Sequence, residues 1–161
     1  MNPQDVDIKL VPIAVLDTQV VLDWLVFKDA GCAALAADLE RGALCWLATA
    51  AMLAELDHVL DRGVAVAWRP DRDRIAQAFE RHGTLVEAPA AVALPLRCTD
   101  CDDQMFIDLA VTACVPWLVT RDRALLALRR RAAARGVAVL RPADWPRRAG
   151  PQDAASSRPP R

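Results

Sequence analysis

The sequence has few of the residues on which several large classes of enzymes depend. Serine occurs only as Ser156 and Ser157, close to the end of the chain, so serine-based hydrolysis is not supported. The only lysines are Lys9 and Lys28, so the late lysine of a response-regulator receiver is absent. There is no GxxxxGK[ST] loop, which excludes a Walker-type ATPase.

Cysteine and histidine are too scattered for a familiar disulfide or zinc framework. The five cysteines make an odd number, and no disulfide pattern is implied. Cys98 and Cys101 form a lone CTDC motif, but the only histidines, His58 and His82, lie in distant helical segments. A structural zinc site needs four ligands. We therefore expect two free thiols beside an acidic loop.

Long apolar runs are also missing, although 54% of the residues are hydrophobic. Each run is interrupted well before the roughly 18 to 20 residues that cross a bilayer. The first ten residues are acidic and lack the basic and then apolar layout of a secretory signal. We expect a cytoplasmic protein without a membrane partner, with one folded domain over residues 1–145. Residues 146–161, rich in Pro, Ser and Arg, are expected to form a flexible tail.

Positive charge is concentrated in the last quarter of the chain. Residues 123–161 contain ten arginines against Asp144 and Asp153, whereas the whole chain has a net charge of −1. A basic end beside an acidic body can steer a polyanion toward a metal-binding centre. Alternatively, Arg129, Arg130 and Arg131 form only the solvated face of the last predicted helix.

Strand and helix patterns alternate along the chain. This alternation predicts an α/β fold, a three-layer α/β/α sandwich with a central, mostly parallel sheet of about five strands. The five tryptophans, Trp24, Trp46, Trp68, Trp117 and Trp145, are expected in the core. Apolar runs predict strands at 10–17, 43–48, 84–89, 117–120 and 137–140. Helical periodicity predicts two short helices within 20–39 and single helices at 49–62, 71–82, 102–115 and 121–136.

Four acids occupy positions from which one site can be built. Asp17 ends the first predicted strand and Asp122 follows the fourth, and the carboxyl ends of strands line the ligand crevice of open α/β sheets. Glu55 lies on the helix at 49–62, and Asp103 lies at the start of the helix at 102–115. Each acid alone is explained equally well as a helix cap or by the helix dipole. Gathered together, they would need protons or a bound cation.

The order and spacing of these acids resemble the signature of PIN domains, compact metal-dependent nucleases. The similarity spans residue 11 to about residue 145 and is closest to the branch described as toxin components of toxin-antitoxin pairs. It implies that residues 1–145 form a PIN-like nuclease domain. Five segments carry it: IAVLDTQV (13–20), MLAELDHVL (52–60), CDDQMFIDLA (101–110), WLVTRDRALL (117–126) and PADW (142–145).

The resemblance implies that four acids bind metal and carry out catalysis. Spacing to MFIDLA favours Asp103 as the third of them, with Asp108 as the runner-up and with Asp102 and Asp100 close by. Hard oxygen ligands suit Mg²⁺ or Mn²⁺. One ion, or two about 4 Å apart, would activate water for attack on a phosphodiester. The four acids are Asp17, Glu55, Asp103 and Asp122.

Supporting roles fall on residues beside the acids. Thr18 and Thr120 match the small polar residues that the family places after the first acid and before the last. Gln19 is a departure, because the family usually has Asn there. The same residue argues against a haloacid-dehalogenase-type phosphatase, which needs an Asp at that position. Arg121 and Arg123 flank the last acid, and we expect that either one contacts the RNA backbone, caps a helix or lies on the surface.

These inferences predict a metal-dependent endoribonuclease, a hydrolase that acts on RNA as the toxin component of a type II toxin-antitoxin pair. A small cognate antitoxin protein and a homodimer are the partners that the resemblance implies. The alternative is a catalytically weak or inactive PIN-like module that acts in RNA binding or protein assembly. The presence of all four acids argues against such decay.

Overall fold

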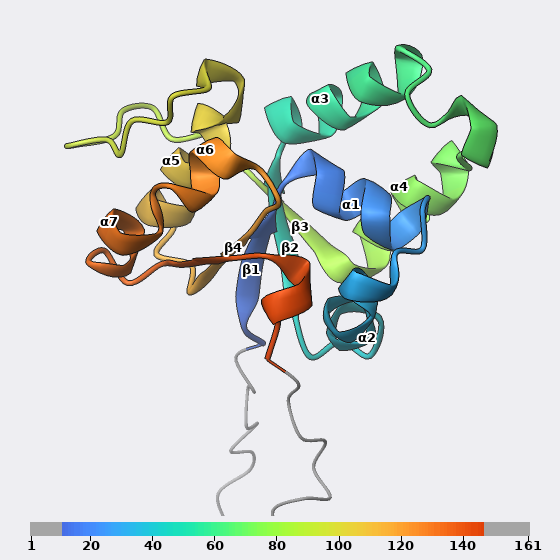
Figure 1. Cartoon of the computed structure of the whole chain (residues 1–161), viewed down its shortest axis with the longest axis horizontal. Coiled ribbons are helices and arrows are strands. Elements are labelled where there is room, and N and C mark those ends of the chain that lie inside the picture. The colour runs from blue at the N-terminus through green and yellow to red at the C-terminus, as the bar shows by residue number, and fades with distance from the viewer. Residues whose placement is uncertain (1–10, 147–161) are drawn as a thin grey trace, which may run out of the picture.

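A computed structural model describes residues 11–146, which fold around a five-stranded parallel sheet with strand order β3-β2-β1-β4-β5 (Figure 1). The strands are β1 (Ile13–Leu16), β2 (Cys45–Thr49), β3 (Gly83–Val86), β4 (Trp117–Val119) and β5 (Ala138–Leu140). The helices are α1 (Thr18–Leu25), α2 (Ala33–Glu40), α3 (Ala50–Asp61), α4 (Arg72–His82), α5 (Gln104–Thr112), α6 (Arg123–Leu126) and α7 (Arg129–Ala133). Short 3-10 turns are η1 (Ala30–Cys32), η2 (Val66–Trp68), η3 (Cys101–Asp103) and η4 (Pro142–Asp144).

The central position of β1 in the sheet explains why its sequence is almost entirely apolar. It pairs in parallel with both β2 and β4, with Ala14 opposite Trp46 on one side and Trp117 on the other. A parallel strand between two neighbours, covered by helices on both faces, has no side exposed to water. Ala14 and Val15 are accordingly fully buried.

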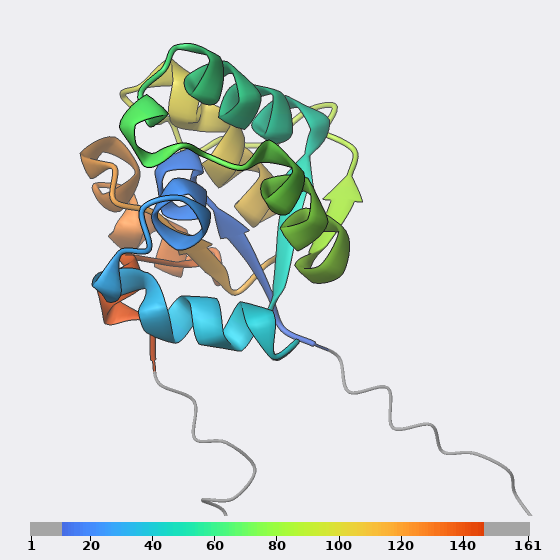
Figure 2. The same cartoon turned by 90° about the vertical axis from the view of Figure 1, so that its right-hand side faces the viewer.

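The helices form two layers, one on each side of the sheet (Figure 1, Figure 2). Helices α1 to α4 lie on one side, and α5 to α7 lie on the other. This arrangement confirms the predicted three-layer α/β/α sandwich. The connections leave β1 in opposite directions across the sheet, first toward β2 and β3 and later toward β4 and β5. The sheet therefore has its topological switch point between β1 and β4.

Helix ends follow the local chemistry that the sequence predicts. The Thr49 hydroxyl caps α3 by accepting from the Met52 amide at 3.4 Å. Gly63, with φ of 75°, follows the end of that helix in the left-handed conformation that glycine tolerates best. The Asp71 carboxylate caps α4 by accepting from the Arg74 amide at 3.1 Å. None of the helices within residues 11–146 combines the length and the apolarity that crossing a bilayer requires.

Two expectations are wrong in detail. The single helix predicted at 121–136 is split into α6 and α7, because the Leu128 amide bonds back to Leu125 in a 3-10 turn. This bend keeps Leu125, Leu128 and Ala132 all buried. Trp68 is 59% exposed and packs edge-on against Phe27, so it is not a core residue.

The other tryptophans are more enclosed than Trp68. Trp24, Trp46 and Trp145 are buried in the core. Trp117 is half-buried and packs against Trp145, with ring centroids 5.1 Å apart. The tail predicted at 146–161 lies outside the described residues from 147 onward.

Candidate metal centre

The carboxyl ends of β1 and β4 bring two of the predicted acids to the switch point of the sheet. Asp17 follows β1 directly, and Asp122 lies three residues beyond β4. The two strands are neighbours, and the Asp17 amide donates to the Val119 carbonyl at 3.0 Å. This is the edge at which open parallel sheets place their ligand crevice.

Asp17 is only 6% exposed, and both of its carboxylate oxygens accept hydrogen bonds. Oδ1 accepts from the Gln19 backbone amide at 3.0 Å, so Asp17 caps the start of α1. Oδ2 accepts from the Thr120 hydroxyl at 2.5 Å. Burial raises the pKa of Asp17 above its ordinary value, the Thr120 bond opposes this shift, and the charge of Asp122 adds to it. A positive charge nearby would lower the free energy needed to keep the buried Asp17 carboxylate ionised.

Thr120 connects the two strand-end acids. It is fully buried, and its amide donates to the Leu140 carbonyl at 2.9 Å, which fixes it against β5. Its hydroxyl donates to Asp17 and accepts from the Asp122 amide at 2.9 Å. Asp122 in turn caps α6, accepting from the Ala124 and Leu125 amides at 2.7 and 3.2 Å. One hydroxyl thus sets the positions of both acids relative to each other.

Asp103 belongs to the same cluster, and it follows the irregular segment between β3 and η3. It ends η3 and precedes α5, and it is half-buried. Burial, the negative charges of Asp122 and Asp17, and a hydrogen bond with the Asp122 carboxyl raise the pKa of Asp103 to about 7. Three carboxylates that interact this strongly lie at one place, so the site holds more negative charge than its protein surroundings balance.

A hard divalent cation fits this donor set. The three acids and the Thr120 hydroxyl offer only oxygen, the ligand that Mg²⁺ and Mn²⁺ prefer. Without a cation, the hydrogen bond between Asp103 and Asp122 requires a proton between two acids. A bound cation would replace this proton and offset the negative charge of the two carboxylates. Mg²⁺ keeps several waters, so its protein ligands need not be in close contact with one another.

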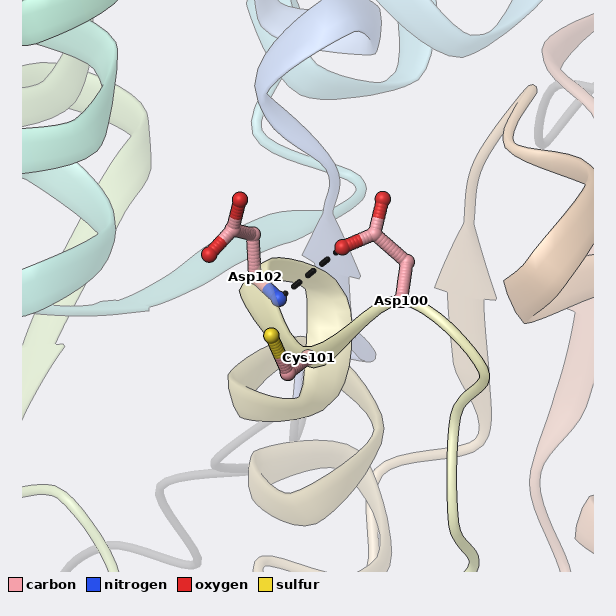
Figure 3. Close-up of side chains that lie close together, drawn as sticks. All are labelled: Asp100, Cys101 and Asp102. Atoms are coloured by element: carbon pink, nitrogen blue, oxygen red, sulfur yellow. Dashed lines mark hydrogen bonds between the residues drawn. The ribbon is translucent and has the colours of Figure 1, made fainter.

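A more compact group lies immediately before Asp103. The ligand atoms of Asp100, Cys101 and Asp102 all lie within 4.8 Å of one another (Figure 3). The carboxylates of Asp17, Asp103 and Asp122 do not form a group with this spacing. All three side chains are exposed, and Asp100 Oδ1 accepts from the Asp102 amide at 3.0 Å, which caps the turn. We interpret this group as a capped helix start that adds negative charge beside Asp103.

Residues 13–124, more than half of the chain, match the sequence family described as PIN domain. The chain belongs to the PIN domain family. Among solved structures, it is similar to a chain in the crystal structure of VapBC2 from Rickettsia felis bound to a DNA fragment from their promoter. The TM-score is 0.55 at 11% identity, and the match covers 80% of this chain and 98% of that chain. At this identity the likeness shows the fold. No curated protein sequence matches the chain.

Glu55 is the predicted acid that this PIN domain does not bring into the cluster. It lies on the second turn of α3 and is half-buried. Its carboxylate is 3.9 Å from the Arg62 guanidinium, and it is not among the charges that shift the pKa of Asp17 or Asp103.

The alternatives to Asp103 have other roles in this PIN domain. Asp108 lies one turn further along α5, where its Oδ1 accepts from the Gln104 amide group at 2.9 Å. That contact faces the 88–98 loop, since Gln104 also bonds to the backbone of Leu96 and Cys98. Asp102 is exposed and belongs to the capped turn. Of these acids, Asp103 is the one whose pKa is raised by the charges of both Asp122 and Asp17.

The two arginines beside Asp122 differ in their surroundings. Arg121 turns toward α1, where its Nε lies 3.1 Å from Asp23 Oδ2 and its Nη2 donates to Asp29 at 3.0 Å. Arg123 is exposed and lines an open hollow together with Asp122 and Asp100. Arg121 is not among the residues that line this hollow. Thr18 opens α1, and its side chain makes no hydrogen bond within residues 11–146.

Asp23 is a residue that sequence reasoning missed. It is 2% exposed, although it lies between the buried residues Leu22 and Trp24 on α1. An acid among apolar helix positions is the signal that could have identified it. A separate cavity of 260 Å³ between α3 and α4 is lined by Leu53, Leu56 and Phe79 and by none of the predicted acids, so it is not the candidate site.

Proposed function

We propose that this PIN domain is a Mg²⁺- or Mn²⁺-dependent endoribonuclease. The observation that carries the proposal is the gathering of Asp17, Asp103 and Asp122 at the switch point of the sheet, where burial and the neighbouring carboxylates raise the pKa of Asp103 to about 7. Protein sites with this much unbalanced negative charge and only oxygen donors suit a divalent cation. Such cations serve phosphodiester cleavage in many enzymes.

The chain's own residues have separable roles in this proposal. Asp17, Asp103 and Asp122 would hold the cation, and Glu55 would complete the set from α3. When bound, the ion supplies an activated water and stabilises the leaving oxygen. Thr120 keeps Asp17 and Asp122 at a fixed separation through its two hydrogen bonds. Arg123, at the rim of the hollow, would bind a phosphate of the RNA backbone.

We further propose that the protein is the toxin of a type II toxin-antitoxin pair, a cytoplasmic homodimer bound by a small antitoxin. The sequence resemblance to toxin components and the structural likeness to a chain of VapBC2 both support this assignment. The RNA target is not implied by the site, because contacts to phosphates do not read base sequence.

The test follows cleavage of a mixed RNA pool with Mg²⁺ or Mn²⁺ by the parent protein and by Asp17→Asn, Asp103→Asn and Asp102→Asn. We expect Asp17→Asn and Asp103→Asn to reduce cleavage to background, because each removes a ligand charge. Asp102→Asn is the matched control, since it removes an exposed charge from the residue next to Asp103 and is expected to cleave at the parent's rate.

Equal products from all four proteins would show a contaminating nuclease and would contradict the proposal. No cleavage by the parent under any metal, with RNA still bound, would favour the alternative of a catalytically inactive RNA-binding or assembly module.

A further inference from the structure

Asp23 is a buried carboxylate that the proposed chemistry does not use. It is 2% exposed on α1, one and a half turns beyond Asp17. Removing a carboxylate from water is expensive, and a buried ion pair contributes little net stability compared with apolar residues of the same size. A purely stabilising role therefore explains Asp23 poorly, and its contacts point to a positional role.

Each oxygen of Asp23 contacts a residue beside the metal-binding candidates. Oδ1 accepts from the Gln19 side-chain amide at 3.1 Å. Oδ2 lies 3.1 Å from Arg121 Nε as an ion pair, but it accepts no hydrogen bond within residues 11–146. Burial raises the pKa of Asp23, and the Gln19 hydrogen bond and, after it, the charge of Arg121 oppose this rise. Gln19 follows Asp17 by two residues, and Arg121 immediately precedes Asp122.

Arg121 is held at its far end as well. Its Nη2 donates to Asp29 Oδ1 at 3.0 Å, and the same oxygen accepts from the Gly31 amide at 2.8 Å. The backbone joins the two acids too, because the Asp29 amide donates to the Asp23 carbonyl at 2.9 Å. Gly31 leaves the required space, since a Cβ there would lie 2.9 Å from Asp29 Oδ1. The guanidinium is thus fixed between two carboxylates, although 42% of the side chain is exposed.

These contacts close a ring that contains one metal-binding candidate and adjoins another. Asp17 accepts from Thr120, Thr120 is bonded to Arg121 along the chain, Arg121 pairs with Asp23, and Asp23 accepts from Gln19. The backbone amide of Gln19, in contrast to its side chain, donates to Asp17 and so closes the ring. Every link except the peptide bond is a polar contact, so the starts of α1 and α6 are tied together on the α1 side of the sheet.

We propose that Asp23 and Arg121 are positioning residues that act together with Thr120 to fix the separation of the Asp17 and Asp122 carboxylates. This inference rests on the proposed metal site. It also assigns a role to Gln19: the side chain at this position must reach four residues along α1, and an Asn would be one methylene shorter. Gln19, which stands where the family usually has Asn, is therefore part of the ring in this chain.

The experiment compares the parent with Asp23→Asn and Arg121→Gln, and with Arg72→Gln as the matched control. Arg72 pairs with Asp61 at 2.6 Å on the exposed surface between α3 and α4, so its loss removes an ion pair far from the ring. The first measurement is Mn²⁺ affinity by calorimetry. We expect Kd to rise roughly 10- to 100-fold in both ring variants, as is usual when partners of metal ligands are removed, and to stay unchanged in the control.

The second measurement does not need metal or RNA. Amide hydrogen exchange is followed by NMR at Gln19 and Asp122, whose amides donate to Asp17 and Thr120, and at Leu47 in the sheet. The ring variants are expected to exchange faster at Gln19 and Asp122 only, whereas a loss of global stability would speed up exchange at Leu47 equally. Arg121→Lys keeps the positive charge but loses the planar guanidinium with its several N–H donors. We expect it to bind Mn²⁺ more tightly than Arg121→Gln and less tightly than the parent.

The results separate the two proposals. Unchanged exchange and unchanged Mn²⁺ affinity in the ring variants would overturn the positioning role, and so would uniformly faster exchange that includes Leu47. If the parent itself binds no Mn²⁺, the metal site is wrong, and the exchange of Gln19 and Asp122 still decides whether the ring positions the two strand ends. Arg121→Gln covers the case in which Asp23→Asn does not fold.

Discussion

Asp103 is the residue at which the electrostatics of the site are most easily measured. Burial and the neighbouring carboxylates Asp122 and Asp17 raise its pKa to about 7, from an ordinary value of 3.8. Between these two values the folded protein keeps a proton that the unfolded chain has already released. Folding is therefore favoured at the acidic end of this window, and the metal-free protein loses that stability as the pH rises from 4 to 7.

We expect thermal unfolding followed by circular dichroism to show this trend. Without metal, Tm should fall as the pH rises from 5 to 7.5, and the increase in Tm on adding Mn²⁺ should grow over the same range, because the ion replaces the proton. Asp103→Asn cannot titrate, so both trends should flatten. A variant with the parent's pH dependence would show that another group causes it.

The start of α5 shows how one side chain can fasten a whole loop. Gln104 accepts from the Cys98 amide at 2.7 Å and donates to the Leu96 carbonyl at 2.8 Å and to Asp108 at 2.9 Å. The chain between β3 and η3 has no helix or strand of its own. We infer that Gln104 keeps this segment against α5 and thereby fixes the approach of the chain to Asp103.

Gln104→Ala should release this segment. We expect a loss of about 1–3 kcal/mol of stability, because the partners are half-buried and are left without their hydrogen bonds. Limited proteolysis should cut within 88–98 faster than in the parent. Gln77→Ala on the exposed face of α4 is the control and should leave the cleavage pattern unchanged. Equal proteolysis of the two variants would contradict the fastening role.

Elements that depend on local pattern were predictable, and arrangements that depend on distant contacts were not. The run that became β1 and the Thr49 cap of α3 are visible in the sequence, because both follow from short-range periodicity and capping. The bend at Leu128 depends on packing against the sheet. The pairing of Asp23 with Arg121 joins residues almost a hundred positions apart, so the sequence predicted for Arg121 only an RNA contact, a helix cap or a surface position. The contact of Glu55 with Arg62, 3.9 Å away, is likewise not visible in the sequence pattern.

At the scale of the whole molecule, the order of the strands decides where the acids gather. Because the chain leaves β1 first to one side and returns to the other, two strand ends that are far apart in sequence become neighbours. Helices α6 and α7 follow β4 and carry basic side chains. Asp122 and the helices α6 and α7 are therefore consecutive parts of one crossover from β4 to β5.

This arrangement predicts a salt-dependent contribution of α7 to RNA binding. Arg130 and Arg131 are exposed and make no side-chain hydrogen bond or ion pair within residues 11–146. If both contact phosphates, replacing them with Gln should make the plot of log K against log salt shallower by about 1.4, since each contact to a single strand contributes about 0.7. Binding would be measured by fluorescence anisotropy with Ca²⁺ in place of Mg²⁺ to prevent cleavage.

The double variant Arg72→Gln, Arg74→Gln removes the same charge from α4, on the other side of the sheet, and should keep the parent's slope. Equal changes in slope for the two double variants would mean that net charge alone, and not the basic face of α7, determines the affinity.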